Sequence, residues 1–152
     1  MKRIFLFLFA LLVACTVPPA AVIQDGNLAV LALNTLNDDA KLLGAPARDS
    51  DAIAVASKAV QTALADLQKG IKTPQDFAAA VNDQVSVLAP TLLADFKANQ
   101  TITTGVVLLQ QLVLVIAAEV TANQSAAPPP PPTARSFNAR AELQIWVLRH
   151  HK

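Results

Sequence analysis

The chain has 152 residues, of which 53% are apolar and 15% charged, and it contains a single cysteine. This length suits one small domain, and a lone cysteine excludes an internal disulfide, so that stability has to come from packing. Residues 15–132 hold ten acidic and six basic side chains, a balance that argues against nucleic acid as a partner.

The first fifteen residues have the pattern of an export signal. Lys2 and Arg3 precede ten uninterrupted apolar residues, Ile4 to Val13. A bilayer span needs about 20 helical residues, whereas the apolar part of a signal peptide has about 7–15. The stretch ends in Leu12-Val13-Ala14-Cys15, which resembles the lipobox of bacterial lipoproteins at all four motif positions.

The resemblance implies a lipid anchor at Cys15. In that family a dedicated peptidase recognises the residues before the cysteine, here Leu12, Val13 and Ala14, and cuts after the last of them. The cysteine carries diacylglycerol and often an acyl chain on the new amino terminus, and no other cofactor is expected. Two or more acyl chains hold a protein firmly on a membrane. Thr16 stands where a signal for inner-membrane retention is usually Asp, which favours the outer membrane facing the periplasm.

Two other interpretations of this segment stay open. An uncleaved anchor from Ile4 to Ile23 would have to pass through Pro18 and Pro19, which break a helix. Ordinary secretory cleavage near Ala20 or Ala21 would instead release the chain without a lipid.

After Cys15 the sequence predicts a lipidated tether over residues 15–27, extended over residues 16–24 and closed by a turn at Asp25-Gly26-Asn27. A helix is expected from Leu28 to Leu43, and Gly44 can supply the left-handed position at its C-terminal end.

The next helix has clear sequence signals. Asp49 or Ser50 is expected to cap it, and Gly70 to end it. Its apolar residues recur with the spacing of one helix face: Ile53, Ala56, Val60, Leu64 and Leu67.

Thr73-Pro74-Gln75-Asp76 has the pattern of a capping box with proline at the first helical position. The helix that it begins is expected to end or kink at Pro90 and to continue as a short helix over residues 91–98. A polar loop is expected over residues 99–104.

Residues 105–120 form the most apolar stretch after the signal segment, and their length favours a buried helix over a strand. A membrane span is the alternative, but only Val106 to Ala118 lack charge, and Gln110 and Gln111 lie in the middle of that stretch.

The chain ends in two units of different character. Residues 125–132 form a linker whose five prolines, Pro128 to Pro132, favour a stiff polyproline II rod. Residues 133–152 form a basic tail, which we expect the rod to hold away from the body. Leu143 to Leu148 could be a helix or a short strand. The tail residues that suit an anionic lipid surface or an acidic envelope partner are Arg135, Arg140, Trp146, Arg149 and Lys152.

The sequence offers little to support a catalytic or metal site. His150 and His151 are adjacent at the terminus, and a structured metal site needs three or four converging ligands. Asp38-Asp39 is interpreted as a solvated face, and Asp49 and Asp51 as charges at a helix start. We therefore predict no catalytic residue, no metal and no enzymatic activity.

Together these patterns predict an all-α fold, a small bundle of three to four helices over residues 28–124. The expected core is Leu31, Leu36, Ile53, Val60, Leu64, Leu67, Phe77, Val81, Val85, Leu88, Leu92, Phe96, Val107, Leu109, Leu112, Val115 and Ile116.

The expected function is that of a small lipoprotein of the bacterial cell envelope with a binding or scaffolding role. The alternative is a phage or prophage envelope lipoprotein, because short lipoproteins with proline-rich segments resemble the outer-membrane partner of spanin pairs, and other phage lipoproteins exclude superinfection. The sequence does not predict the oligomeric state.

Overall fold

The computed structural model describes residues 20–124 and 134–151, and this part of the chain is almost entirely helical. The helices are α2 (Ala20–Leu42), α3 (Ala47–Gln68), α4 (Pro74–Asp95), α5 (Gln100–Gln124) and α6 (Ala134–His150). The all-α class is therefore confirmed, whereas the expected three to four helices are too few for the described chain, which has five. The signal segment, Cys15 and the linker over residues 125–132 lie outside the described residues.

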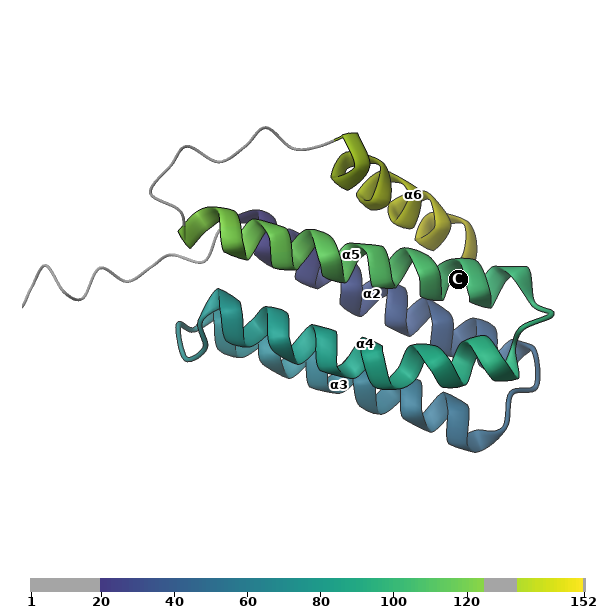
Figure 1. Ribbon diagram of the computed structural model, residues 1–152. Helices are drawn as coiled ribbons and strands as arrows, with labels where there is room; N and C mark the ends of the chain where they lie inside the picture. The colour runs from purple at the N-terminus through teal and green to yellow at the C-terminus, as the bar shows by residue number, and fades with distance from the viewer. Residues whose placement is uncertain (1–19, 125–133, 152) are drawn as a thin grey trace, which may run out of the picture.

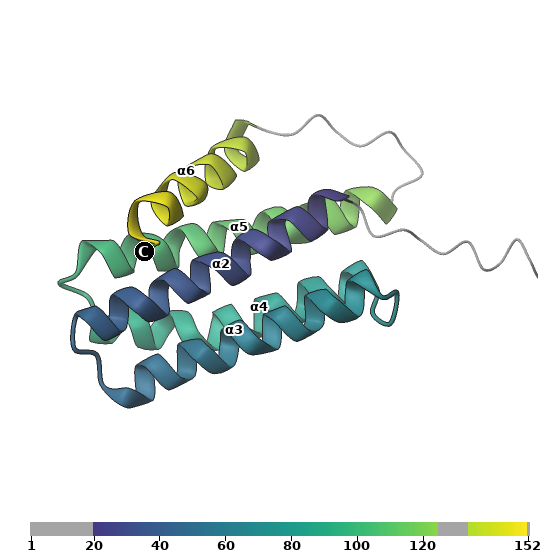
Figure 2. The same ribbon diagram turned by 180° about the vertical axis from the view of Figure 1, so that it is seen from behind.

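Helices α2 to α5 form a closed antiparallel bundle in which each helix packs against two neighbours (Figure 1). The contacting pairs are α2 with α3, α3 with α4, α4 with α5, and α5 with α2. Seen from behind, α6 lies across α2 and α5 on the outside of this bundle (Figure 2). The first residues of α2, the last residues of α5 and the turn between α3 and α4 lie at the same end.

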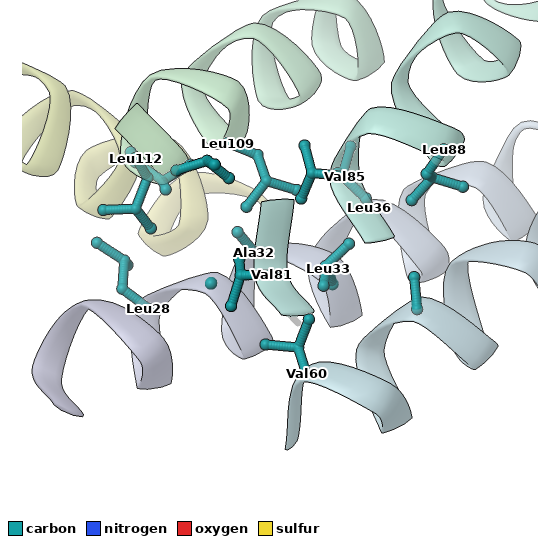
Figure 3. Packing of buried hydrophobic residues seen from close by; sticks show 14 of the residues in the cluster. Leu28, Ala32, Leu33, Leu36, Val60, Val81, Val85, Leu88, Leu109 and Leu112 are labelled. Carbon is teal, nitrogen blue, oxygen red and sulfur yellow. The ribbon is translucent and has the colours of Figure 1, made fainter. Parts of the chain in front are cut away.

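The bundle core consists mainly of aliphatic side chains from all four helices, such as Leu33, Val60, Val85 and Leu109 (Figure 3). Most of the predicted core is confirmed as buried: Leu36, Ile53, Val60, Leu64, Leu67, Phe77, Val81, Val85, Leu88, Leu92, Leu109, Leu112, Val115 and Ile116.

Three predicted core positions differ. Leu31 and Val107 were wrong, because they are 36% and 43% exposed on the outer faces of α2 and α5. Phe96 is only partly buried at the end of α4.

The expected turn at Asp25-Gly26-Asn27 is wrong, because α2 already begins at Ala20 and runs through these residues. The tether can therefore be extended only before Ala20. Gly26 is in the helix for a packing reason: a Cβ atom there would lie 2.7 Å from both Leu64 Cδ1 and Phe77 Cζ. Only glycine lets α3 and α4 approach α2 this closely.

The start of α3 also differs from the prediction. The helix begins at Ala47 after Pro46, and no side chain caps it. Asp49 lies in the first turn, where its negative charge is favourable, and it is buried. Ser50 donates a hydrogen bond from Oγ to the carbonyl of Ala47 at 3.0 Å instead of capping.

The capping box at Thr73 is confirmed. Thr73 Oγ1 accepts from the backbone N–H of Asp76 at 3.2 Å, and Asp76 Oδ2 accepts from the backbone N–H of Thr73 at 3.1 Å. The Thr73 hydroxyl also donates to Asp76 Oδ2 at 2.7 Å, and this hydrogen bond, together with the one from the backbone N–H of Thr73, holds the pKa of Asp76 below its ordinary value.

The helix does not end at Pro90 but continues to Asp95. Pro90 is exposed, so that the carbonyl left without a partner in the preceding turn can bond to water. The polar loop expected over residues 99–104 is also too long, because α5 begins at Gln100, where Asn99 Oδ1 accepts from the N–H of Ile102 at 3.0 Å.

Candidate functional site

The C-terminal residues form a helix packed on the bundle, and this docking seam between α6, α2 and α5 is the most elaborate polar arrangement that the structure describes. The residues buried against the bundle are Ala139, Leu143, Trp146 and Val147, which recur at helical spacing. The prediction that the tail is held away from the body is therefore wrong for α6, and the choice between helix and strand for Leu143 to Leu148 is settled as helix.

A charge cluster fixes the N-terminal half of α6. The Arg140 guanidinium donates to both carboxylate oxygens of Asp25 on α2, with Nε–Oδ1 and Nη2–Oδ2 distances of 2.8 Å each. It also donates to Glu119 on α5. Asp25 is almost fully buried, whereas Arg140 and Glu119 are partly exposed. One cation thus bridges two acids from two helices of the bundle.

The cluster contains two carboxylates and one guanidinium, so that it holds one more negative charge than positive charge. This excess contributes to a change in the pKa of Glu119. Burial raises the pKa of Glu119, and the charge of Asp25 adds to the rise, while the hydrogen bond and the charge of Arg140 oppose it. Glu119 Oε2 is buried without a hydrogen-bond partner. The hydrogen bond to Asp25 in turn raises the pKa of Arg140, so that the guanidinium stays charged.

An aromatic contact fixes the C-terminal half of α6. Trp146 Nε1 donates to the backbone carbonyl of Thr101 at 3.2 Å, and atoms of the six-membered ring of the indole come close to Gly105 of α5. A Cβ atom at Gly105 would lie 2.7 Å from Trp146 Cη2 and 2.9 Å from Cε2. The ring of His150 packs on the outer side, with 5.1 Å between the ring centroids. In this half of the seam, the Trp146 ring therefore occupies the space that a side chain at position 105 of α5 would need.

The predicted anionic-surface residues do not form one surface in the described chain. Arg140 and Trp146 face the bundle, so that they are not available to a partner while α6 is docked. Arg149 is exposed beside Leu148 at the end of α6. Arg135 belongs to α6, but its side chain, like Lys152, lies outside what the structure describes.

The other acids and histidines that the sequence singled out do not come together in one cluster within the described residues. Asp38 is exposed, but the expectation of a solvated face is wrong for Asp39, which is buried. Within the described residues, no group of three or more His, Cys, Asp or Glu side chains comes close enough to hold a metal ion. A crevice between α2, α4 and α5 is lined only by aliphatic side chains, including Leu36, Leu88 and Leu109, and has no room for a water molecule.

Sequence reasoning missed Asp25, Glu119 and Gly105 as members of the seam. Asp25 was interpreted as part of a turn, and Gly105 only as the first residue of the helix expected over residues 105–120. Glu119 offered a signal, because it is the one charge within a long apolar stretch. Because buried acids are usually paired with a cation, such a residue indicates that a basic side chain from another helix lies beside it.

Within residues 20–124 and 134–151, two helices are long and apolar enough to cross a membrane, by length and composition alone. They are α4 and α5, with mean hydropathy of 1.2 and 2.0 over their most apolar windows. Half of the α5 window is buried inside the bundle, as expected for a core helix.

Comparisons with protein-family models, with curated proteins and with solved structures gave no match.

Proposed function

We propose that this chain is a lipid-anchored protein of the bacterial cell envelope with a non-enzymatic binding or scaffolding role. The observation that carries the proposal is the sequence Leu12-Val13-Ala14-Cys15 after an apolar stretch too short to span a bilayer. Diacylglycerol and an acyl chain on Cys15 would hold the mature chain on the membrane, with the outer membrane favoured by Thr16.

The spacing between the anchor and the bundle supports this proposal. The first helix begins at Ala20, five residues after Cys15. Five residues reach at most about 17 Å when fully extended. The bundle would therefore stand close to the lipid surface. The α3–α4 turn lies at the end of the bundle where α2 begins (Figure 1).

A binding role is supported by how the polar groups of the seam are used. Arg140, Asp25 and Glu119 hold α6 against the bundle, and Trp146 is packed against α5. These contacts serve to fix the shape of a surface that a partner can recognise.

The test compares the full-length chain with Cys15→Ser in a Gram-negative host supplied with a labelled fatty acid. Thr16→Ser serves as the matched control, because it changes the neighbouring residue but keeps the thiol. The wild type and Thr16→Ser are expected to take up label and to stay in the membrane fraction. Cys15→Ser is expected to take up none. A wild type without label, or label that persists in Cys15→Ser, would overturn the proposal.

A further inference from the structure

Helix α6 covers one face of a bundle that is closed without it. Helices α2 to α5 contact one another in a ring of four, and α6 packs from outside on the side of α2 and α5 that bears Asp25, Gly105 and Glu119, here called the α2–α5 face (Figure 2). Removing a helix of the ring would open the core, whereas removing α6 would leave the ring closed. Peripheral elements open at smaller free energies than the core. The seam is therefore where this chain can open while keeping its fold.

One recognition point of the α2–α5 face is acidic. Asp25 of α2 and Glu119 of α5 both accept hydrogen bonds from the guanidinium of Arg140. Replacing a buried ion pair with apolar residues often leaves a fold equally stable or more stable, so stability alone does not require the charges. The best attested use of such a charge is to fix which helix binds and in which register. The face therefore selects a helix that carries a cation at this position.

The other recognition point accepts an aromatic ring. Gly105 leaves room on α5 for the indole of Trp146, and the carbonyl of Thr101 accepts from Nε1 at 3.2 Å. Trp146 follows Arg140 by six residues, which is about 9 Å along a helix. The remaining buried side chains of α6 are Ala139, Leu143 and Val147. Buried residues that recur with this spacing are the pattern by which an amphipathic helix binds in a groove of another protein.

Helix α6 does not satisfy every polar group of the face. While α6 is docked, Glu119 Oε2 is buried without a hydrogen-bond partner. The face has two carboxylates at this point, and Arg140 is the one cation that bonds to both. A second helix with the same anchoring residues would therefore lose nothing by comparison with α6.

We propose that the α2–α5 face is a binding site for an amphipathic helix of a partner protein, and that α6 is the occupant within the chain which the partner helix displaces. The partner helix has an arginine, an aliphatic residue three positions later and a tryptophan three positions further on, as α6 has Arg140, Leu143 and Trp146. The inference rests on the binding role proposed above but not on the anchor at Cys15. While α6 is docked, the face is free in a fraction of the chains, and the apparent affinity for the partner helix falls by that fraction.

The test uses the full-length chain, purified from the membrane fraction in a mild non-ionic detergent, and a fluorescent synthetic peptide with the sequence of residues 134–151. Fluorescence anisotropy measures the binding of this peptide. A peptide with Arg140→Glu is the matched control, because it keeps the tryptophan and the apolar side chains but places a negative charge beside Asp25 and Glu119. Circular dichroism shows whether each variant of the chain keeps its helices.

Two variants of the chain weaken the docking of its own α6, but only one of them blocks the face. Trp146→Ala removes the indole from α6 and leaves the face unchanged. Gly105→Ala fills the space that an incoming indole needs, because the new Cβ would lie 2.7 Å from Trp146 Cη2. We expect Trp146→Ala to bind the peptide roughly tenfold more tightly than the wild type does. Gly105→Ala is expected to bind it no more tightly than the wild type.

Two further readouts place the peptide on the same face. Trp146 is the single tryptophan of the chain, so in a mixture with Trp146→Ala the peptide supplies the only indole. Its emission is expected to shift to the blue when the peptide binds. Arg140→Met weakens α6 at the acidic point while leaving the indole in place, and it is also expected to bind the peptide more tightly than the wild type does.

Several results would overturn the proposal. Equal binding of the two peptides would show attraction to detergent or to any apolar surface. Equal affinity of Trp146→Ala and Gly105→Ala for the peptide would show that it binds elsewhere. No binding to either Trp146→Ala or Arg140→Met, or loss of the helices in both, would show that α6 is a fixed part of the fold. None of these results affects the uptake of labelled fatty acid at Cys15, so the proposed anchor is tested separately.

Discussion

Replacing Gly105 with alanine tests the seating of Trp146 on α5 directly. The new Cβ would lie 2.7 Å from Cη2 and 2.9 Å from Cε2 of the indole. The ring is rigid, and its Nε1 is tied to the carbonyl of Thr101 at 3.2 Å. It therefore cannot turn aside in place, and the C-terminal half of α6 has to move away from α5.

Two opposing effects set the size of the change. Alanine in the middle of a helix is more favourable than glycine by about 1 kcal/mol. Forcing an extra methyl group into a packed contact is unfavourable by about 1–3 kcal/mol. The steric effect is expected to win, because part of the buried surface of Trp146 and its hydrogen bond to Thr101 are lost with it. The net change expected is a loss of about 1 kcal/mol in unfolding free energy.

Trp146 is the chain's single tryptophan, so its fluorescence reports on this contact alone. We expect Gly105→Ala to shift the emission to the red and to lower the urea midpoint followed by that emission. Thr104→Ala is the control, because it raises helix propensity at a neighbouring exposed position without meeting the indole. Unchanged emission with a raised midpoint in Gly105→Ala would refute the proposed close packing of α6 on α5.

Two further predictions concern the charge cluster. Arg140→Met is expected to lower the unfolding free energy by about 1–3 kcal/mol, because it leaves the buried Asp25 carboxylate without its partner. Urea unfolding followed by Trp146 fluorescence measures this change. A loss of unfolding free energy no larger than that of Arg149→Met would contradict the prediction. Because burial raises the folded-state pKa of Glu119 above its ordinary value, the folded chain binds that proton more tightly than the unfolded chain. The unfolding free energy of the wild type relative to Glu119→Gln is therefore expected to increase as pH falls from 7 through the raised pKa, and a constant or decreasing difference between pH 7 and pH 4 would show that Glu119 is not so perturbed.

The parts of the fold that depend on local patterns could be predicted from the sequence. The capping box at Thr73 and Asp76 involves residues three apart, and both its hydrogen bonds are present. Gly44 and Gly70 end helices with φ of +71°, as their positions after apolar stretches indicated. The apolar stripe of α3 depends only on the 3.6-residue period, and every member of it is buried.

The other two glycines show where local patterns fail. Gly26 and Gly105 have the composition signal of a turn, but both lie inside helices where another element comes too close for a side chain. Leu64, Phe77 and Trp146 cause that close approach, and they are distant in sequence. Whether a glycine ends a helix or makes room for a neighbour depends on packing that a single sequence does not reveal.

The seam was hidden from sequence reasoning for a similar reason. Arg140 lies 115 residues from Asp25 and 21 from Glu119. The basic charge of the tail was visible and suggested an anionic partner, and the structure shows that one such partner is the bundle itself. The charge pattern correctly indicated the kind of group that Arg140 binds but not where that group lies.

The most direct measurement of the proposed anchor is the mass of the N-terminal fragment of the mature protein, isolated from the membrane fraction and cut by a protease. We predict a fragment that begins at Cys15 and carries the added mass of diacylglycerol, with or without a further acyl chain. A fragment that begins at Met1, or at a residue near Ala20 without lipid, would show that the chain is held in the envelope by other means or is released from the membrane.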